Sequence, residues 1–267
     1  MRAGGGRASG RINYIWRLIG TGFSFSAFGL GALALSVFVF PLLNLAIGDR
    51  ERRMRIAQGI VHWSFRLFVG TMTTLGVIAV EVRGKAVLRA DRGRLIIANH
   101  PSLIDVVLLV SLLRQTQCVV KHQNWRNPFM RGVLVATGYI RNDDDPEKLI
   151  EACADVLRAG ENLLIFPEGS RSVPGQPRLL QRGFANIALA AQTPIRLVTI
   201  HCVPATLTKG AKWYEIPPTR SLFTVTVHEL IDVRELARDE PPSIAVRRLT
   251  SHVARRFREI LPDAGGA

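Results

Sequence analysis

The 267-residue sequence predicts an α/β domain with a mainly parallel sheet flanked by helices, preceded by an N-terminal membrane-embedded helical segment. Two observations predict this architecture. From residue 77 onward, short apolar segments alternate with amphipathic segments of helical period, which is typical of a parallel sheet with crossover helices. Residues 18–48 carry no charged side chain, and about 20 apolar residues suffice to cross a bilayer as a helix.

The composition indicates a partner that is both anionic and apolar. Lys and Arg total 35 against 21 Asp and Glu, giving a net charge of +14, and 48% of the residues are hydrophobic. A membrane surface fits both features, whereas a nucleic acid explains only the charge. Aromatic residues make up 7% of the chain, and stacking aromatics are a hallmark of single-stranded nucleic-acid binding. We therefore expect membrane lipids as partners and no nucleic acid.

Cysteine usage indicates a reducing compartment. Cys118, Cys153 and Cys202 form no C-x-x-C pair, which argues against a disulfide framework and against a zinc site. We expect ordinary thiols and no bound metal.

The first 76 residues divide into three segments. Residues 1–17 are rich in Gly and Arg and are expected to be flexible. Residues 18–48 are expected to lie in the membrane, and they are too long for the apolar part of a cleaved signal peptide. A straight helix over this segment measures about 46 Å against an apolar thickness of about 30 Å. It therefore tilts, or it bends near Gly29, Gly31 or Pro41 and returns to the same side.

Residues 49–76 predict a basic amphipathic helix with two candidate locations. It lies in the headgroup layer as an interfacial helix, or it packs on the following domain with its arginines in solvent. Four arginines precede the apolar segment and four follow it, so the positive-inside rule does not fix the orientation.

Residues 77–267 form the α/β domain. Its predicted strands lie at 77–82, 94–98, 117–121, 138–141, 162–166, 195–203 and 222–230. Its predicted helices lie at 101–113, 127–136, 182–191 and 243–261, with a further helix that begins at Pro146. Asp145 provides the N-cap of that helix, Pro146 occupies its first position, and Gly160 ends it.

The segment 99–105, Asn-His-Pro-Ser-Leu-Ile-Asp, stands at a strand-to-helix junction and offers an acid–base pair. With Pro101 starting the helix, His100 lies at the carboxyl end of the strand, where open α/β sheets place ligands. Asp105, one turn into the helix, can reach back to the imidazole, fix its tautomer and leave the other nitrogen as a base. The alternative is a carboxylate that complements the helix dipole.

A second motif, Phe-Pro-Glu-Gly-Ser-Arg-Ser at 166–172, directly follows a buried strand. A guanidinium beside a flexible glycine and hydroxyl groups can bind phosphate through paired hydrogen bonds and backbone amides. The alternative is a turn held by contacts between Glu168 and Arg171. Arg141, at the end of another short strand, offers a further cation.

These two motifs, in this order and spacing, resemble those of the glycerolipid acyltransferases, notably the bacterial 1-acyl-glycerol-3-phosphate acyltransferases, over about residues 75–205. The resemblance implies that His100 is the general base and that Asp105 orients it. It also implies an acceptor site in which Arg171 binds a phosphate, and its substrate-binding residues are Arg141, Glu168, Gly169, Ser170 and Arg171.

The resemblance further implies an O-acyltransferase that needs no cofactor. An acyl group would pass from acyl-CoA or acyl carrier protein to the hydroxyl of a lysophospholipid such as 1-acyl-glycerol-3-phosphate. A thioester is already activated, so base-assisted attack needs no serine nucleophile. The implied location is the bacterial inner membrane, with the catalytic domain in the cytoplasm.

Two departures from the family pattern leave the acceptor open. Arg141 follows Tyr139-Ile140 in an irregular motif, and Arg196 stands in a segment where the family commonly has Pro-Ile-Val-Pro. An ornithine lipid or a specialised glycolipid is an alternative acceptor. Two different functional classes also fit the fold: a hydrolase that uses water, and a non-catalytic membrane-anchored protein. The intact His100–Asp105 pair argues against the non-catalytic class.

Overall fold

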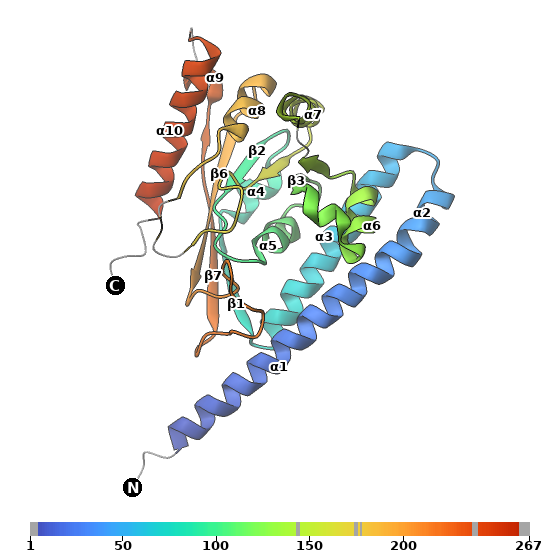
Figure 1. Ribbon diagram of the computed structural model, residues 1–267, viewed down its shortest axis with the longest axis vertical. Helices are drawn as coiled ribbons and strands as arrows, with labels where there is room; N and C mark the ends of the chain where they lie inside the picture. Colours follow the sequence, from blue (N-terminus) through green and yellow to red (C-terminus); the bar gives the residue numbers. More distant parts are fainter. Residues whose placement is uncertain (1–4, 143–144, 174–175, 177, 237–239, 262–267) are drawn as a thin grey trace.

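A computed structural model describes residues 5–142, 145–173, 176, 178–236 and 240–261 (Figure 1). The chain begins with a long, nearly continuous helical segment. Helix α1 (Gly5–Ala34) passes through a π-helical turn η1 (Leu35–Val39) into α2 (Phe40–Ala46). Within it, Gly10–Ala46 is long and apolar enough to cross a membrane, judged by length and composition.

Two expectations for the N-terminus need correction. The basic segment expected to be flexible is helical from Gly5 onward. The chain does not turn back near Gly29, Gly31 or Pro41; it reverses after α2 and returns beside α1 as α3 (Arg50–Thr74) (Figure 1). The Asp49 side chain caps α3 by accepting a hydrogen bond from the Arg52 amide.

Helix α3 packs on the α/β domain. Its Gln58 side chain donates to the Thr137 carbonyl at 3.1 Å, and Nδ1 of His62 lies 2.9 Å from the carbonyls of Val110 and Leu113. These contacts show that one face of α3 packs on the α/β domain, which is one of the two expected locations. Residues buried on that face are Ala57, Gln58, Val61, His62, Phe68 and Met72.

Within the described residues, seven strands form one sheet in the order β1-β7-β6-β2-β5-β3-β4. All neighbouring pairs are parallel except β6 and β7, which confirms the mainly parallel sheet. The strands are β1 (Ile78–Arg83), β2 (Leu95–Ala98), β3 (Gln117–Lys121), β4 (Ile140–Asn142), β5 (Leu163–Ile165), β6 (Ile195–Val203) and β7 (Ser221–Ile231).

Helices cover both faces of the sheet, as the burial of the short strand β2 shows. Leu95 and Ile97 join one core cluster, whereas Ile96 and Ala98 join the other, because successive side chains of a strand point to opposite faces. All four are fully buried, as expected where both faces are covered. The cluster of Ile96 and Ala98 includes residues of α3, α5 (Asp105–Leu112) and α6 (Pro128–Thr137). The cluster of Leu95 and Ile97 includes residues of α7 (Pro146–Arg158), α8 (Gly183–Ala191) and α10 (Pro242–Ile260).

Most predicted elements are present within a few residues, and the predicted cap is confirmed because the Asp145 side chain accepts from the Lys148 amide. Three short elements were not predicted, since each is too short to show a hydrophobic period. They are α4 (Lys85–Ala90), the 3₁₀ helix η2 (His122–Arg126) and α9 (Val233–Leu236).

The start of α5 also differs from expectation, and it matters for the site. The helix begins at Asp105, not at Pro101. Two hydrogen bonds hold the intervening residues in a turn: the Ser102 amide donates to the Asp105 carboxylate at 2.6 Å, and the Leu103 amide donates to the Leu207 carbonyl at 3.0 Å.

Candidate active site

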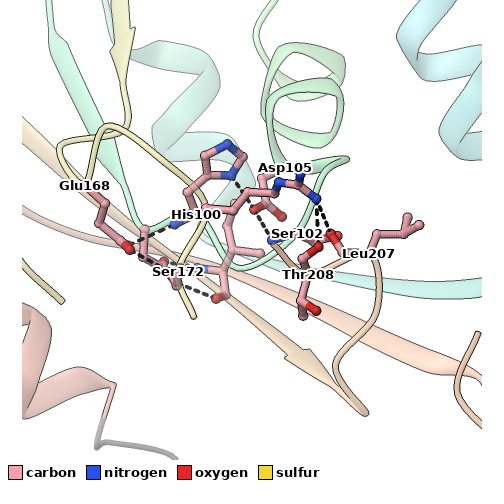
Figure 2. Close-up of polar contacts among 10 residues, drawn as sticks. His100, Ser102, Asp105, Glu168, Ser172, Leu207 and Thr208 are labelled. Carbon is pink, nitrogen blue, oxygen red and sulfur yellow. Dashed lines mark hydrogen bonds and ion pairs between the residues drawn. The ribbon is translucent and has the colours of Figure 1, made fainter. Parts of the chain in front are cut away.

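His100 and Asp105 form a hydrogen-bonded pair at the carboxyl end of β2 (Figure 2). Nδ1 of His100 lies 2.8 Å from Oδ2 of Asp105, whose side chain is fully buried, while 17% of the imidazole is exposed. The Phe166 ring lies 4.4 Å from the imidazole, centroid to centroid, and limits its rotation. The pair that the sequence suggested is therefore assembled, with the imidazole at the surface and the carboxylate behind it.

The environment of Asp105 suits it to orient the imidazole. Burial raises the pKa of the Asp105 carboxyl, and the hydrogen bonds from His100 and from the Ser102 amide oppose that rise. When Nδ1 donates to the carboxylate, the lone pair of Nε2 is left to accept a proton. A ring held in this tautomer can act as a general base.

The second motif holds the first in place through Glu168. The His100 amide donates to Oε1 of Glu168 at 3.1 Å, and the Ser172 hydroxyl donates to Oε2 at 2.7 Å. The Ser172 amide donates in turn to the His100 carbonyl at 2.7 Å (Figure 2). Glu168 is thus a positioning residue for the loop of His100, a role that the motif alone did not indicate.

Arg171 contacts a third loop, which the sequence did not indicate as part of the site. Its Nη1 donates to the carbonyls of Leu207 at 3.0 Å and Thr208 at 2.8 Å, in the loop after β6. The Leu207 carbonyl also accepts the Leu103 amide described above. Leu207 adopts a left-handed conformation with φ of 53°. A leucine gives no sequence signal for that conformation, so the position could not be found by motif.

Gly169 and Ser170 form the tip of the second loop. Gly169 has φ of +66°, which favours glycine, and its amide donates to the Phe166 carbonyl at 3.0 Å. The Ser170 hydroxyl lies 3.5 Å from Nζ of Lys209, a basic residue of the third loop. The tip therefore brings a hydroxyl and an ammonium group together beside the acid–base pair.

Arg141 stands apart from this cluster. It lies in β4 at the edge of the sheet, and β3 and β5 separate it from β2. At about 4.8 Å per strand the two strands are about 14 Å apart. The carboxyl end of β4 lies at the same edge of the sheet as His100, but Arg141 takes part in none of the hydrogen bonds described above.

The assembled site consists of three loops at the carboxyl ends of β5, β2 and β6, which are neighbours in the sheet. It offers a base oriented by a buried carboxylate, with cationic and hydroxyl groups alongside. Among the described residues, no three or more His, Cys, Asp or Glu side chains are grouped to hold a metal ion.

Comparison with known families accounts for this combination. The family model described as Acyltransferase matches residues 79–205, a range that contains both motifs. Residues 79–205 are therefore similar to an acyltransferase-family domain. The match covers just under half of the chain and includes the strands β2 to β6 and all of β1 except its first residue.

Curated relatives of the acyltransferase domain have one activity in their names. A 1-acyl-sn-glycerol-3-phosphate acyltransferase from Cocos nucifera is 34% identical over 105 residues, which are 37% of this chain and 34% of that protein. One from Borreliella burgdorferi is 27% identical, covering 64% of this chain and 68% of that protein. The match to a Chlamydomonas reinhardtii relative covers 58% of that protein, so this chain spans less than two thirds of the Cocos nucifera and Chlamydomonas reinhardtii proteins.

A solved structure extends the similarity to the whole fold. The crystal structure of the 1-acyl-sn-glycerophosphate (LPA) acyltransferase PlsC from Thermotoga maritima matches with a TM-score of 0.65. The match covers 93% of this chain and 98% of that one at 20% sequence identity. It therefore confirms the fold, including the helical segment that precedes the acyltransferase domain.

Proposed function

We propose that this protein transfers a fatty acyl group from a thioester donor, acyl-CoA or acyl carrier protein, to the hydroxyl of a lysophospholipid such as 1-acyl-glycerol-3-phosphate. The observation that carries the proposal is the contact of 2.8 Å between Nδ1 of His100 and the buried carboxylate of Asp105. The pair matches the need of the reaction for a positioned base beside an acceptor hydroxyl. The names of the curated relatives support the choice of acceptor.

The proposed reaction is a direct transfer. Nε2 of His100 takes the proton of the acceptor hydroxyl while the oxygen attacks the thioester carbonyl. The resulting tetrahedral species expels the thiolate, and His100 returns the proton to that sulfur. The products are an ester and a free thiol, and no residue of the protein is acylated. Asp105 stabilises the imidazolium that exists between the two proton transfers.

In this proposal the second motif and its neighbours bind the acceptor headgroup. A guanidinium has five N–H donors, so an Arg171 that holds two carbonyls through Nη1 retains donors for a phosphate. Gly169 and Ser170 add a backbone turn and a hydroxyl at the loop tip. Arg141 would reach a more distant part of a substrate, in keeping with its place at the edge of the sheet.

One departure from the family pattern lies outside the site. Arg196, near the start of β6, is 9% exposed and pairs with Asp91 through two hydrogen bonds of 2.7 and 2.8 Å. The site lies at the opposite end of this strand. The departure at Arg196 is therefore explained by a buried ion pair and does not favour an acceptor other than a lysophospholipid.

Membrane attachment belongs to the same proposal. Helix α1 contacts the rest of the protein at successive levels: Trp16 donates to the Leu75 carbonyl, and Phe25 and Phe28 pack against Phe68. A helix held along a domain in this way favours insertion parallel to one leaflet over a perpendicular crossing. We place the acyltransferase domain on the cytoplasmic face of a bacterial inner membrane, and the three free cysteines support a reducing compartment.

Lipid mass spectrometry tests the proposal. Purified protein in lipid nanodiscs is given labelled acyl-CoA or acyl carrier protein and a panel of lysolipids that includes lyso-ornithine lipid. His100→Ala should lower acyl transfer by about 10²–10⁴-fold, while the control His252→Ala on α10 should keep the wild-type rate. Wild-type turnover in His100→Ala would refute the mechanism, and transfer to another lysolipid alone would refute the acceptor.

A further inference from the structure

The loop between β6 and β7 carries exposed aromatic and basic side chains beside the apolar helix α1. Trp213 is 48% exposed and Tyr214 is 44% exposed, and their rings meet edge to face at 5.6 Å. Nζ of Lys212 lies 5.5 Å from the centre of the Tyr214 ring. In Figure 1 this loop, coloured orange, lies next to the middle of α1.

The position of Trp213 is fixed by its contact with α1. A Cβ atom added to Gly22 would lie 3.2 and 3.4 Å from two atoms of the Trp213 ring, so a larger residue there would force the ring to move. The next residue, Phe23, is 60% exposed. It belongs to an exposed apolar stripe of α1 at helical spacing, made by Ile12, Ile15, Trp16, Ile19 and Phe23. Trp213 therefore borders this stripe.

The side chains of this loop have the chemistry of a membrane interface. Tryptophan and tyrosine concentrate where the apolar core meets the headgroups, and basic side chains near an anionic surface are attracted to it. The acidic member of the loop, Glu215, accepts a hydrogen bond from the Lys212 amide at 3.0 Å and so serves to hold the turn. The ammonium of Lys212 lies beside the aromatic pair.

We propose that Lys212, Trp213 and Tyr214 form a second membrane contact, distant in sequence from α1, that docks on an anionic phospholipid surface. The proposal rests on the membrane attachment described under Proposed function and names a further element that makes it. The aromatic pair enters the interface at the level of the apolar stripe of α1, and Lys212 meets lipid phosphates.

This contact would connect the lipid surface to the candidate active site. The same loop supplies the Thr208 carbonyl that holds Arg171 at 2.8 Å, and the Lys209 ammonium that meets the Ser170 hydroxyl at 3.5 Å. Docking of residues 212–214 therefore places the proposed headgroup-binding loop beside the surface from which a lysolipid arrives.

Tryptophan quenching by lipids with brominated acyl chains tests the contact. The chain has four tryptophans, so the contribution of Trp213 is the difference between wild type and Trp213→Phe, each reconstituted in vesicles. We expect Trp213→Phe to lose a measurable part of the quenching. Equal quenching of the two proteins, with matching circular dichroism, would overturn the proposal.

Charge dependence tests the nature of the partner. In wild type, Trp213 quenching should be stronger in phosphatidylglycerol vesicles than in phosphatidylcholine vesicles, and salt at about 0.5 M should remove the difference. Lys212→Glu should abolish the preference, while the control Lys148→Glu on α7 should retain it. Equal quenching in both lipids for wild type would refute an anionic surface as the partner.

The outcome does not depend on catalysis. All quenching measurements can be made on the His100→Ala background without substrates, so loss of acyl transfer leaves them interpretable. Conversely, acyl transfer by a protein whose Trp213 is not quenched would refute this contact while leaving the proposed function standing.

Discussion

The amide of His100 donates a hydrogen bond to the carboxylate of Glu168 at 3.1 Å, and this bond joins two motifs that lie 68 residues apart. The loop of the proposed base therefore takes its position from the loop of the proposed acceptor site. A second bond, from the Ser172 amide to the His100 carbonyl, runs in the opposite direction. Each loop restrains the other, so substitutions in the second motif should change the position of the His100 imidazole.

Glu168→Gln should lower kcat more than it raises the acceptor KM. Glu168 accepts the His100 amide at Oε1 and the Ser172 hydroxyl at Oε2, and a glutamine replaces one of these two oxygens by an NH2 donor, so the two bonds cannot both be kept as they are. Loss of one hydrogen bond to a charged group costs about 1.5–3 kcal/mol, which corresponds to about 10–100-fold in rate if it acts on the transition state. Steady-state kinetics with each substrate varied separately provide the measurement. A pure KM effect would instead indicate direct contact of Glu168 with the acceptor.

Arg171→Lys should raise the acceptor KM and also lower the melting temperature. A lysine cannot reproduce the planar fork that binds phosphate, and it loses the paired contacts to the carbonyls of Leu207 and Thr208. Titration of donor and lysolipid separately, with thermal unfolding of the same samples, distinguishes the two contributions. If both KM values rise equally while the melting temperature falls, Arg171 only braces the third loop and binds no phosphate.

Asp105→Asn should separate stability from activity. Burial raises the folded-state pKa of Asp105 above its unfolded value of about 4, so its contribution to stability is full below that pH and is lost as the pH rises through the folded-state pKa. Asparagine does not titrate, so the variant should gain stability relative to wild type as the pH rises above about 4. Its kcat should nevertheless fall, because an amide stabilises the imidazolium poorly.

Thermal unfolding across this pH range, beside turnover at neutral pH, checks both parts of the Asp105 prediction. A stability difference that does not change with pH would show that burial leaves the pKa of Asp105 unshifted. Unchanged turnover would show that Asp105 is a buried structural carboxylate with no role in orienting His100.

Arg17→Ala should destabilise the contact between α1 and the loop before β7. The guanidinium of Arg17, a residue that is only 3% exposed, donates to the carbonyls of Pro217, Pro218 and Thr219. Leaving these carbonyls without their charged donor should lower the free energy of unfolding by about 1.5–3 kcal/mol. The control is Arg11→Ala, on an exposed part of the same helix. Equal melting temperatures of the two variants in detergent would show that the hydrogen bonds of Arg17 to these carbonyls do not stabilise the protein.

The full-length protein should stay in the membrane pellet after alkaline carbonate extraction. Residues 18–48 have no charge, and burial of their apolar surface in lipid is favourable at about 25 cal/mol/Å². The comparison is a peripheral membrane protein in the same preparation, which carbonate should release. Recovery of this chain in the supernatant would contradict insertion of the apolar segment.

The sequence by itself determined the type of each long element and the chemistry of the candidate site. Period-2 and period-3.6 patterns located six of the seven strands closely, because burial on one or both faces dictates which positions must be apolar. The Asp145 cap and the pairing of His100 with Asp105 were also readable, since each depends on residues that are at most five apart. Local geometry sets such contacts, and local geometry is encoded in short segments.

Only the tertiary structure decided which distant groups meet. The Leu207 carbonyl receives both Arg171 and the Leu103 amide, and Glu168 supports His100 in place of pairing with Arg171. Each of these contacts involves a backbone group, which every residue carries, so the residue types in the sequence do not predict them. Strand order, which places β5, β2 and β6 side by side and leaves Arg141 at the edge, is likewise fixed by packing across the whole sheet. The side chains of the site could therefore be predicted from the sequence. The backbone hydrogen bonds that orient them form only when the chain has folded.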